Sequence, residues 1–189
     1  MQAENDITIY RPIEEVFEYV STPENDPTWV PASLRNERTL PGPMRVGMST
    51  QEDVKFLGRA LTDTSWRVIE YEPPTVVAYR ATSSLLSGGI VRVRCEPVEG
   101  GTRLRHAVEY EPGGIYFRAL APLLPWVMRR MIASMDHTLK NLLEGETTTP
   151  SGRAEPAASR ALMGGVVVVS VLVVLAFLLV WRRSHPSRR

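Results

Sequence analysis

The stretch WVMRRMIASMDHTLKNLLE, residues 126–144, decides the fold of this chain. Its apolar side chains recur every three or four residues, which is the spacing of one face of an α-helix. They are Met128, Met131, Ile132, Met135, Leu139 and Leu142. Five polar side chains lie off this stripe: Arg129, Arg130, Asp136, His137 and Lys140. We therefore predict a long amphipathic helix whose apolar face must be covered by another layer of structure.

Three methionines on this predicted face leave two interpretations open. Unbranched thioether side chains fill irregular space and adapt to more than one packing, so Met128, Met131 and Met135 suit the wall of a ligand cavity. They suit a tightly packed core equally well.

The residues before this helix supply the covering layer. Residues 7–10 alternate as a short strand, and residues 13–20 carry an apolar stripe at helical spacing. Residues 21–31 contain three prolines and predict an irregular segment, in which Trp29 packs under the edge of a sheet. From residue 34 to residue 110 the apolar positions alternate between turn residues, which predicts five or six antiparallel strands.

The predicted sheet has one apolar face and one charged face. The last two strands meet at Gly100-Gly101, a dipeptide typical of a hairpin turn. Four arginines occupy their alternate, polar positions: Arg92, Arg94, Arg103 and Arg105. Such alternation is expected of an antiparallel sheet that is covered on one side only.

Charge and cysteine content exclude several classes of protein. Residues 1–150 contain 16 Lys and Arg against 20 Asp and Glu, so the chain has no basic surface for nucleic acid. The single cysteine, Cys95, has no partner for an intrachain disulfide and is expected to be a small buried residue. Because no metal-ligand spacing is present, we expect neither a metal nor a cofactor.

Residues 111–126 form an apolar segment before the long helix. Pro122 and Pro125 predict a break or kink in any helix here. Three roles are open: a gate over a cavity, a surface in contact with lipid, and an ordinary core-packed elbow.

The C-terminal part of the chain predicts a membrane anchor. Residues 161–181 are 21 uncharged residues, and as a helix they would be about 31 Å long, matching a hydrocarbon core of about 30 Å. We therefore predict a globular domain over residues 1–145, a flexible linker over 146–160, a transmembrane helix over 161–181 and a basic tail over 182–189.

The orientation of this anchor rests on two opposing signals. Four arginines follow the apolar run, Arg182, Arg183, Arg188 and Arg189, and by themselves favour a cytoplasmic C-terminus. The first six residues lack the basic and apolar regions of a signal peptide, which favours a tail-anchored protein. We expect a single-pass membrane protein with a C-terminal anchor and a cytoplasmic domain.

Several short motifs in this order resemble the SRPBCC superfamily of START-like and polyketide cyclase/dehydrase-like domains. They are ITIYRPIEEVF at 7–17, Trp29-Val30-Pro31, Val46-Gly47, VIEYEPP at 68–74 and Gly100-Gly101-Thr102. The resemblance covers about residues 4–145. It implies an α+β helix-grip fold, with a seven-stranded antiparallel sheet wrapped around the C-terminal helix and a hydrophobic cavity between them. It does not specify a ligand, because members of the superfamily range from lipid carriers to cyclases.

Two polar residues on the predicted apolar face are candidates for chemistry. His106 and Glu52 fall in register with apolar neighbours, and inside an apolar pocket they could act as acid and base on an enolisable ligand. Alternatively, His106 hydrogen-bonds a neighbour or a ligand head group, and Glu52 reaches solvent. We favour a binding role over catalysis.

The cavity predicted by this arrangement is lined by side chains from the strands, the apolar segment and the long helix. These are Phe56, Trp66, Tyr79, Val93, His106, Val108, Tyr110, Phe117, Met128, Met131 and Met135. The leading hypothesis is a membrane-anchored binding module for a hydrophobic small molecule or lipid. The alternatives are a cyclase/dehydrase-like enzyme and a non-catalytic interaction scaffold that uses the arginine-rich face.

Overall fold

The computed structural model describes residues 1–56, 59–83, 88–110 and 124–145, without the side chains of residues 56, 59 and 61–63. These residues belong to one compact unit, Met1–Thr147. Seven antiparallel strands form one sheet in the order β1-β7-β6-β5-β4-β3-β2. In chain order they are β1 (Gln2–Ile9), β2 (Ser33–Arg38), β3 (Ser49–Phe56), β4 (Arg59–Glu72), β5 (Val76–Ala81), β6 (Ile90–Val98) and β7 (Gly101–Glu109). The α+β fold and the seven-stranded sheet are therefore confirmed.

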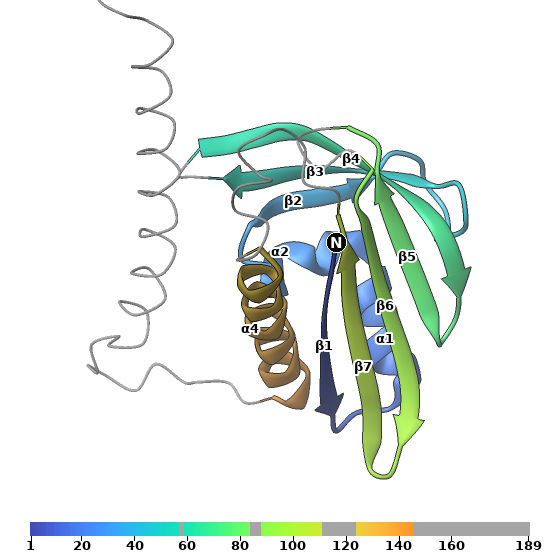
Figure 1. The fold of residues 1–189 in the computed structure, drawn as a ribbon. Coiled ribbons are helices and arrows are strands. Elements are labelled where there is room, and N and C mark those ends of the chain that lie inside the picture. Colours follow the sequence, from blue (N-terminus) through green and yellow to red (C-terminus); the bar gives the residue numbers. More distant parts are fainter. Residues whose placement is uncertain (57–58, 84–87, 111–123, 146–189) are drawn as a thin grey trace, which may run out of the picture. The chain divides into compact units, whose positions relative to one another are not determined.

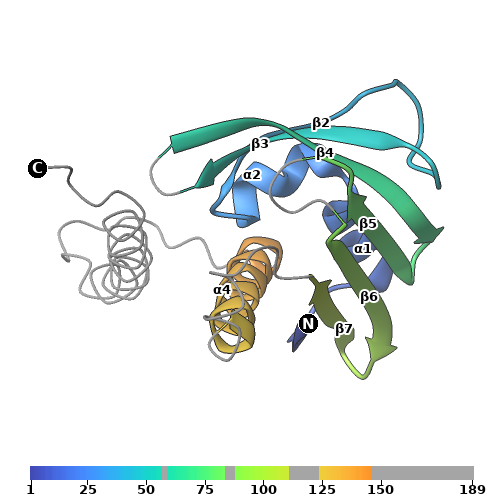
Figure 2. The ribbon, with the colours of Figure 1, turned by 45° about the horizontal axis from the view of Figure 1, so that its top comes forward.

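The helices lie on the inner side of this curved sheet (Figure 1). They are α1 (Ile13–Ser21), the 3₁₀ helix η1 (Pro23–Asn25), α2 (Asp26–Trp29) and α4 (Leu124–Glu144). Strands β2–β4 arch over α2, and β5–β7 run beside α1, as a second view shows (Figure 2). The α4 helix packs mainly against β1. The segment predicted to be irregular thus contains two short helices, and Pro23 and Pro27 stand in their first turns, where a missing N–H costs nothing.

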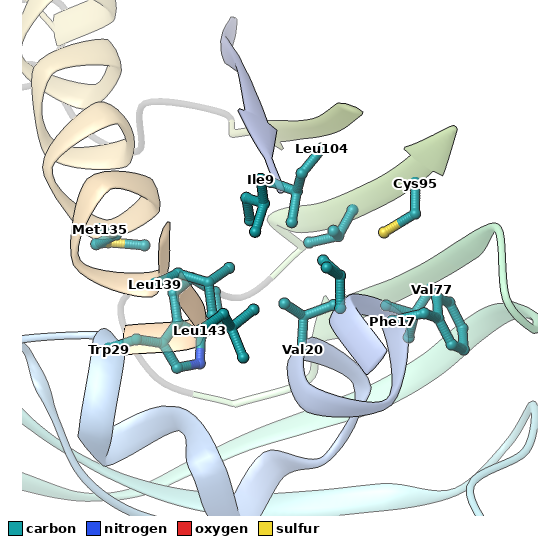
Figure 3. Packing of buried hydrophobic residues seen from close by; sticks show 12 residues of the cluster. Ile9, Phe17, Val20, Trp29, Val77, Cys95, Leu104, Met135, Leu139 and Leu143 are labelled. Carbon is teal, nitrogen blue, oxygen red and sulfur yellow. The ribbon is translucent and has the colours of Figure 1, made fainter. Parts of the chain in front are cut away.

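The main core joins α1 and α4 to the strands (Figure 3). Phe17 and Val20 of α1, Leu139 of α4, and Ile9 and Leu104 of the sheet belong to one buried cluster, in which Phe17 lies beside Val77 and Leu139 beside Leu143. Burying one such side chain contributes roughly 1.5–3 kcal/mol. Cys95 belongs to the same cluster, 1% exposed, and burial raises the pKa of its thiol to about 12, so the expectation of a small buried residue is confirmed.

The first strand is longer than the sequence pattern predicted. β1 begins at Gln2 rather than at Ile7 and pairs with β7 from Gln2–Glu109 to Ile9–Thr102. The prediction was wrong because the polar residues at the start of β1 are held by backbone pairing to β7 and not by an apolar face. Here the partner strand, and not the side-chain pattern, determines where the strand begins.

The apolar face of α4 is rotated from the predicted stripe. Met131 is 43% exposed and Leu142 is 44% exposed, so their predicted place on the core face is wrong. Leu143 is buried instead, and Asp136, predicted to lie off the stripe, is completely buried. The buried positions 132, 135, 136, 139 and 143 keep helical spacing, and the polar side chain at 136 is accepted because two partners bind it.

Arginines on the outer face of the sheet form ion pairs with acidic side chains of the same domain. Arg92 bonds Glu70 at 3.0 Å and Glu109 at 3.1 Å, and Arg105 bonds Asp6 at 2.9 Å. Exposed pairs of this kind contribute about 0–1 kcal/mol each. They leave less free charge for a partner than the sequence pattern alone indicated.

The predictions for the apolar segment 111–123 and for the C-terminal regions 146–160, 161–181 and 182–189 concern residues outside those that the structure describes. Among the residues that are described, no helix is both long and apolar enough to span a membrane. The α4 helix fails this requirement because charged side chains occur along its length.

Candidate functional site

A row of polar side chains crosses the inner face of β2, β3 and β4. Asn36 pairs with Glu52 across β2 and β3, and Glu52 pairs with Thr64 across β3 and β4. Directly paired residues in a sheet point to the same face, so these three side chains are neighbours. Thr50 lies two residues before Glu52 on the same face of β3, and its hydroxyl is buried.

The α2 helix adds a carboxylate opposite this row. Asn36 donates its side-chain N–H to Asp26 Oδ2 at 2.7 Å. Together Asp26, Asn36, Thr50, Glu52 and Thr64 form what we call the acceptor cluster. Apart from Asp26, which is half-buried, its members are 1–6% exposed.

Both carboxylates of the acceptor cluster are harder to ionise than usual. Burial raises the pKa of Asp26 to about 7; the hydrogen bond from Asn36 lowers it, and the negative charge of Glu52 raises it further. Burial also raises the pKa of Glu52, opposed by the hydrogen bond that Trp66 Nε1 donates to Glu52 Oε2 at 2.7 Å. Neither carboxylate has a cation within 4 Å in the described part of the chain.

Several polar atoms of the acceptor cluster have no partner. Among the described residues, Thr50 Oγ1, Thr64 Oγ1 and Asn36 Oδ1 are buried and make no hydrogen bond. Leaving such a group unpaired costs about 1–3 kcal/mol. In native proteins, buried polar atoms of this kind usually form hydrogen bonds with ordered water or with a bound molecule. The acceptor cluster could therefore form hydrogen bonds with polar atoms of a ligand.

A second buried polar group links the sheet to α4. His106 Nδ1 of β7 lies 2.9 Å from Asp136 Oδ1, and Asn5 of β1 donates to Asp136 Oδ2 at 2.9 Å. The ring of Trp29 lies 6.0 Å from the His106 ring, centroid to centroid. With Nδ1–H donated to the carboxylate, Nε2 would be the free, basic atom of the imidazole.

The two candidates for chemistry belong to different hydrogen-bond networks. His106 is bound to Asp136, whereas Glu52 is bound to Trp66, and no hydrogen bond in the described ranges joins the two networks. Both side chains point into the interior, at 2% and 6% exposure. The alternative in which Glu52 reaches solvent is therefore wrong.

Apart from the buried His106, the predicted cavity residues fall into four groups. Val93 and Met135 are buried in the main core and Tyr79 packs against it, its hydroxyl donating to Ser21 O at 3.3 Å. Trp66, Val108, Tyr110 and Met128 are half-buried, while Met131 is exposed. Phe117 and the side chain of Phe56 lie outside the described residues.

Two hollows occur at other places on the described surface. A groove of about 510 Å³ lies beside α1, with Phe17, Met44 and Tyr71 on its walls and Glu14 and Glu18 on its rim. A depression of about 210 Å³ lies between β1 and α4. Neither is lined by the acceptor cluster, and no unpartnered buried atom faces either one, so their size alone does not make them the better site.

Four polar residues of the two networks were missed at the sequence level. Asp26 and Asn36 stand in segments without a clear apolar pattern, and Asn5 precedes the predicted start of its strand. Only Asp136 carried a signal, because it keeps helical phase with Ile132, Leu139 and Leu143. Within the described ranges, His, Cys, Asp and Glu side chains form no group of three arranged to hold a metal ion.

A curved antiparallel sheet closed over a long C-terminal helix, with polar groups inside, defines the helix-grip class. The model of the family described as "Polyketide cyclase / dehydrase and lipid transport" matches residues 1–144, and the chain belongs to this SRPBCC family. No curated protein matches the sequence at a significant level.

Solved structures confirm the fold at low sequence identity. TTHA0849 from Thermus thermophilus has a TM-score of 0.64 and 14% identity, and the match covers 78% of this chain and 100% of that one. The di-domain ARO/CYC StfQ from the steffimycin biosynthetic pathway has a TM-score of 0.60 and 17% identity, covering 77% of this chain and 51% of that one. The Aha1 dimer from Colwellia psychrerythraea has a TM-score of 0.54 and 18% identity, covering 80% and 99%.

Proposed function

We propose that this chain is a membrane-anchored binding module for a hydrophobic small molecule or lipid, held between the sheet and α4. The observation that carries the proposal is the set of unpaired, buried oxygens of the acceptor cluster on the inner face of the sheet. An apolar ligand with a polar end would satisfy these oxygens while its apolar part stays in the interior. The family description, which includes lipid transport, supports the same class of ligand.

Extraction of the purified chain tests this proposal. The full chain is isolated in mild detergent, washed, extracted with organic solvent and analysed by mass spectrometry. We expect one ligand class in near-stoichiometric amount. A Thr64→Leu variant, which places a larger apolar side chain beside Glu52, should carry much less, whereas Leu142→Ala on the exposed side of α4 should carry the wild-type amount. An empty wild-type chain would contradict the proposal.

The anchor is part of the proposal and concerns residues 161–181. Their composition of eight Val, five Leu and one Phe favours insertion by several kcal/mol at roughly 0.3–0.6 kcal/mol per residue. A tether would keep the domain close to lipid and raise its effective concentration there. We expect the full chain in the carbonate-resistant membrane fraction and a Leu172→Arg, Leu175→Arg variant in the supernatant.

Protease protection tests the proposed location of the domain on the cytoplasmic side of the membrane. In closed cells or right-side-out vesicles, protease added from outside should leave the domain intact, and permeabilisation should expose it. Digestion without permeabilisation would place the domain on the other side.

A second candidate function is cyclase- or dehydrase-like catalysis through His106. The observation in its favour is the buried His106–Asp136 pair, because a carboxylate that holds Nδ1–H leaves Nε2 ready to accept a proton. If the extracted ligand is enolisable, turnover should fall by about 10²–10⁴-fold in His106→Gln. Equal turnover in wild type and His106→Gln would exclude this role.

A further inference from the structure

The acceptor cluster has a composition that selects one kind of polar group. Its two strong donors are already used, since Trp66 Nε1 is bound to Glu52 and the Asn36 side-chain N–H is bound to Asp26. What remains is acceptor capacity on the carboxylate oxygens that no donor occupies and on Asn36 Oδ1, together with the hydroxyls of Thr50 and Thr64, which can accept or donate. Among the described residues, the buried Trp29 Nε1–H beside Asp26 and the Ser33 hydroxyl beside Glu52 also have no hydrogen-bond partner. A ligand group with several hydrogen-bond donors could use these carboxylate and carbonyl oxygens together, and the threonine hydroxyls can turn to accept from it.

The charge of the acceptor cluster also favours a ligand group that donates hydrogen bonds. The negative charge of Glu52 helps to raise the pKa of Asp26, after burial, and among the described residues neither carboxylate has an Arg, Lys or His ion-pair partner. Glu24 of η1 also faces Asp26, but its charge is taken by Arg38 at 2.8 Å. A bound positive charge would stabilise the buried Glu52 carboxylate and the half-buried Asp26 carboxylate, which lack a cation of their own.

The two threonines of the acceptor cluster provide evidence for a binding site that does not depend on its carboxylates. Thr50 and Thr64 are each 1% exposed, their hydroxyls are unpaired, and Thr64 is the direct cross-strand neighbour of Glu52. Their hydroxyls therefore face the same space as the Glu52 carboxylate. A primary ammonium, with three donors and no acceptor, could bind a carboxylate, the Asn36 carbonyl and a threonine oxygen together.

From this geometry we infer that the acceptor cluster binds the protonated amine of an apolar ligand, so that the chain is selective for amphiphilic amines. The inference rests on the proposed function, because it names the polar end of the ligand held between the sheet and α4. It also predicts a pH dependence. Asp26, faced by Glu52, Glu24, Tyr79, Asn36 and Trp29, takes up a proton as the pH falls through about 7 and then attracts an ammonium less strongly.

The test compares three water-soluble probes with the same alkyl chain: hexylamine, 1-hexanol and hexanoate. Binding to the full chain in mild detergent is measured by calorimetry at pH 8 and pH 5.5. At pH 8 we expect hexylamine to bind at least about tenfold more tightly than 1-hexanol, and hexanoate to bind more weakly than either. At pH 5.5 the preference for the amine should shrink several-fold.

Amino-acid substitutions test whether the acceptor cluster causes the preference for hexylamine. Asp26→Asn and Glu52→Gln should each lose most of the preference for hexylamine over 1-hexanol, and a cooperative urea-unfolding transition shows that each variant folds. Glu18→Gln removes the same charge from the exposed surface of α1 and should retain the preference. Retention of the preference in both cluster variants would overturn the inference.

The other outcomes separate this inference from the proposed function. Equal binding of hexylamine and 1-hexanol, or an extracted ligand without a basic nitrogen, would mean that the cluster holds water or a neutral group, and would overturn the inference alone. Failure of all three probes to bind a chain that also extracts empty would overturn both.

Discussion

His106 Nδ1 on β7 and Asp136 Oδ1 on α4 lie 2.9 Å apart, and the two side chains are 2% and 0% exposed. They are 30 residues apart in the sequence, so this hydrogen bond ties the last helix to the sheet. Asn5 binds the second oxygen of the same carboxylate and brings β1 into the link. Because water does not reach the pair, a lost partner cannot be replaced by solvent.

Removing the carboxylate should therefore destabilise the domain. We expect Asp136→Ala to lower the free energy of unfolding by about 2–4 kcal/mol, since it leaves His106 and Asn5 unpaired in a buried place. Urea unfolding of the full chain in mild detergent measures the loss. Asp136→Asn keeps an acceptor oxygen and should lose less. A change below about 0.5 kcal/mol in Asp136→Ala would show that the link carries little stability.

Two methionines on α4 provide a matched comparison of the two sides of the helix. Met135 is 9% exposed within the main core, whereas Met131 is 43% exposed. Met135→Ala should cost about 2–4 kcal/mol and Met131→Ala about 0.5 kcal/mol or less in the same unfolding measurement. Equal costs would mean that the face of α4 that packs on the sheet is not the one in the structure.

The class of fold followed from the sequence because its main signals are periodic. Alternating positions predicted the inner faces of the strands, and Val77, Val93 and Leu104 are indeed buried there. The long helix was found from its apolar spacing, to within two residues of its start. Both signals depend on burial of apolar side chains, which is the dominant favourable term in folding.

The candidate site was predicted only in part, for a physical reason. Glu52 and His106 were found because each interrupts an apolar face, but Asp26 and Asn5 have no such context in the sequence. Their roles arise from partners far along the chain: Asp136 is 131 residues from Asn5. A polar residue is buried only where tertiary structure supplies its partner, so local patterns underestimate such networks.

The unpaired hydroxyl of Thr64 gives a prediction that separates stability from binding. Thr64→Val removes a buried oxygen without a partner and keeps the branched shape, so the ligand-free chain should be as stable as wild type or more stable by about 1 kcal/mol. Ligand recovered by extraction should fall, because one acceptor is lost. Thr75→Val, at an exposed turn hydroxyl bonded to Glu72 O, serves as the control and should leave ligand recovery unchanged. Lower stability together with full ligand recovery would contradict an acceptor role.

The buried carboxylate of Asp26 makes stability depend on pH in a defined direction. Its pKa is about 7 in the folded chain against an ordinary value of 3.8, so between these values the folded state holds a proton that the unfolded state releases. The stabilisation is complete below about pH 4 and is lost as the pH rises through 7.

Asn at this position keeps an acceptor for Asn36 and has no proton to lose. The difference in unfolding free energy between Asp26→Asn and wild type should therefore shift in favour of the variant by up to roughly 4 kcal/mol between pH 4 and pH 8. Urea unfolding of the ligand-free full chain across this range measures it, with Glu18→Gln as the exposed control. A difference that stays constant with pH would show that Asp26 titrates normally and that the inner face of β2–β4 is well solvated.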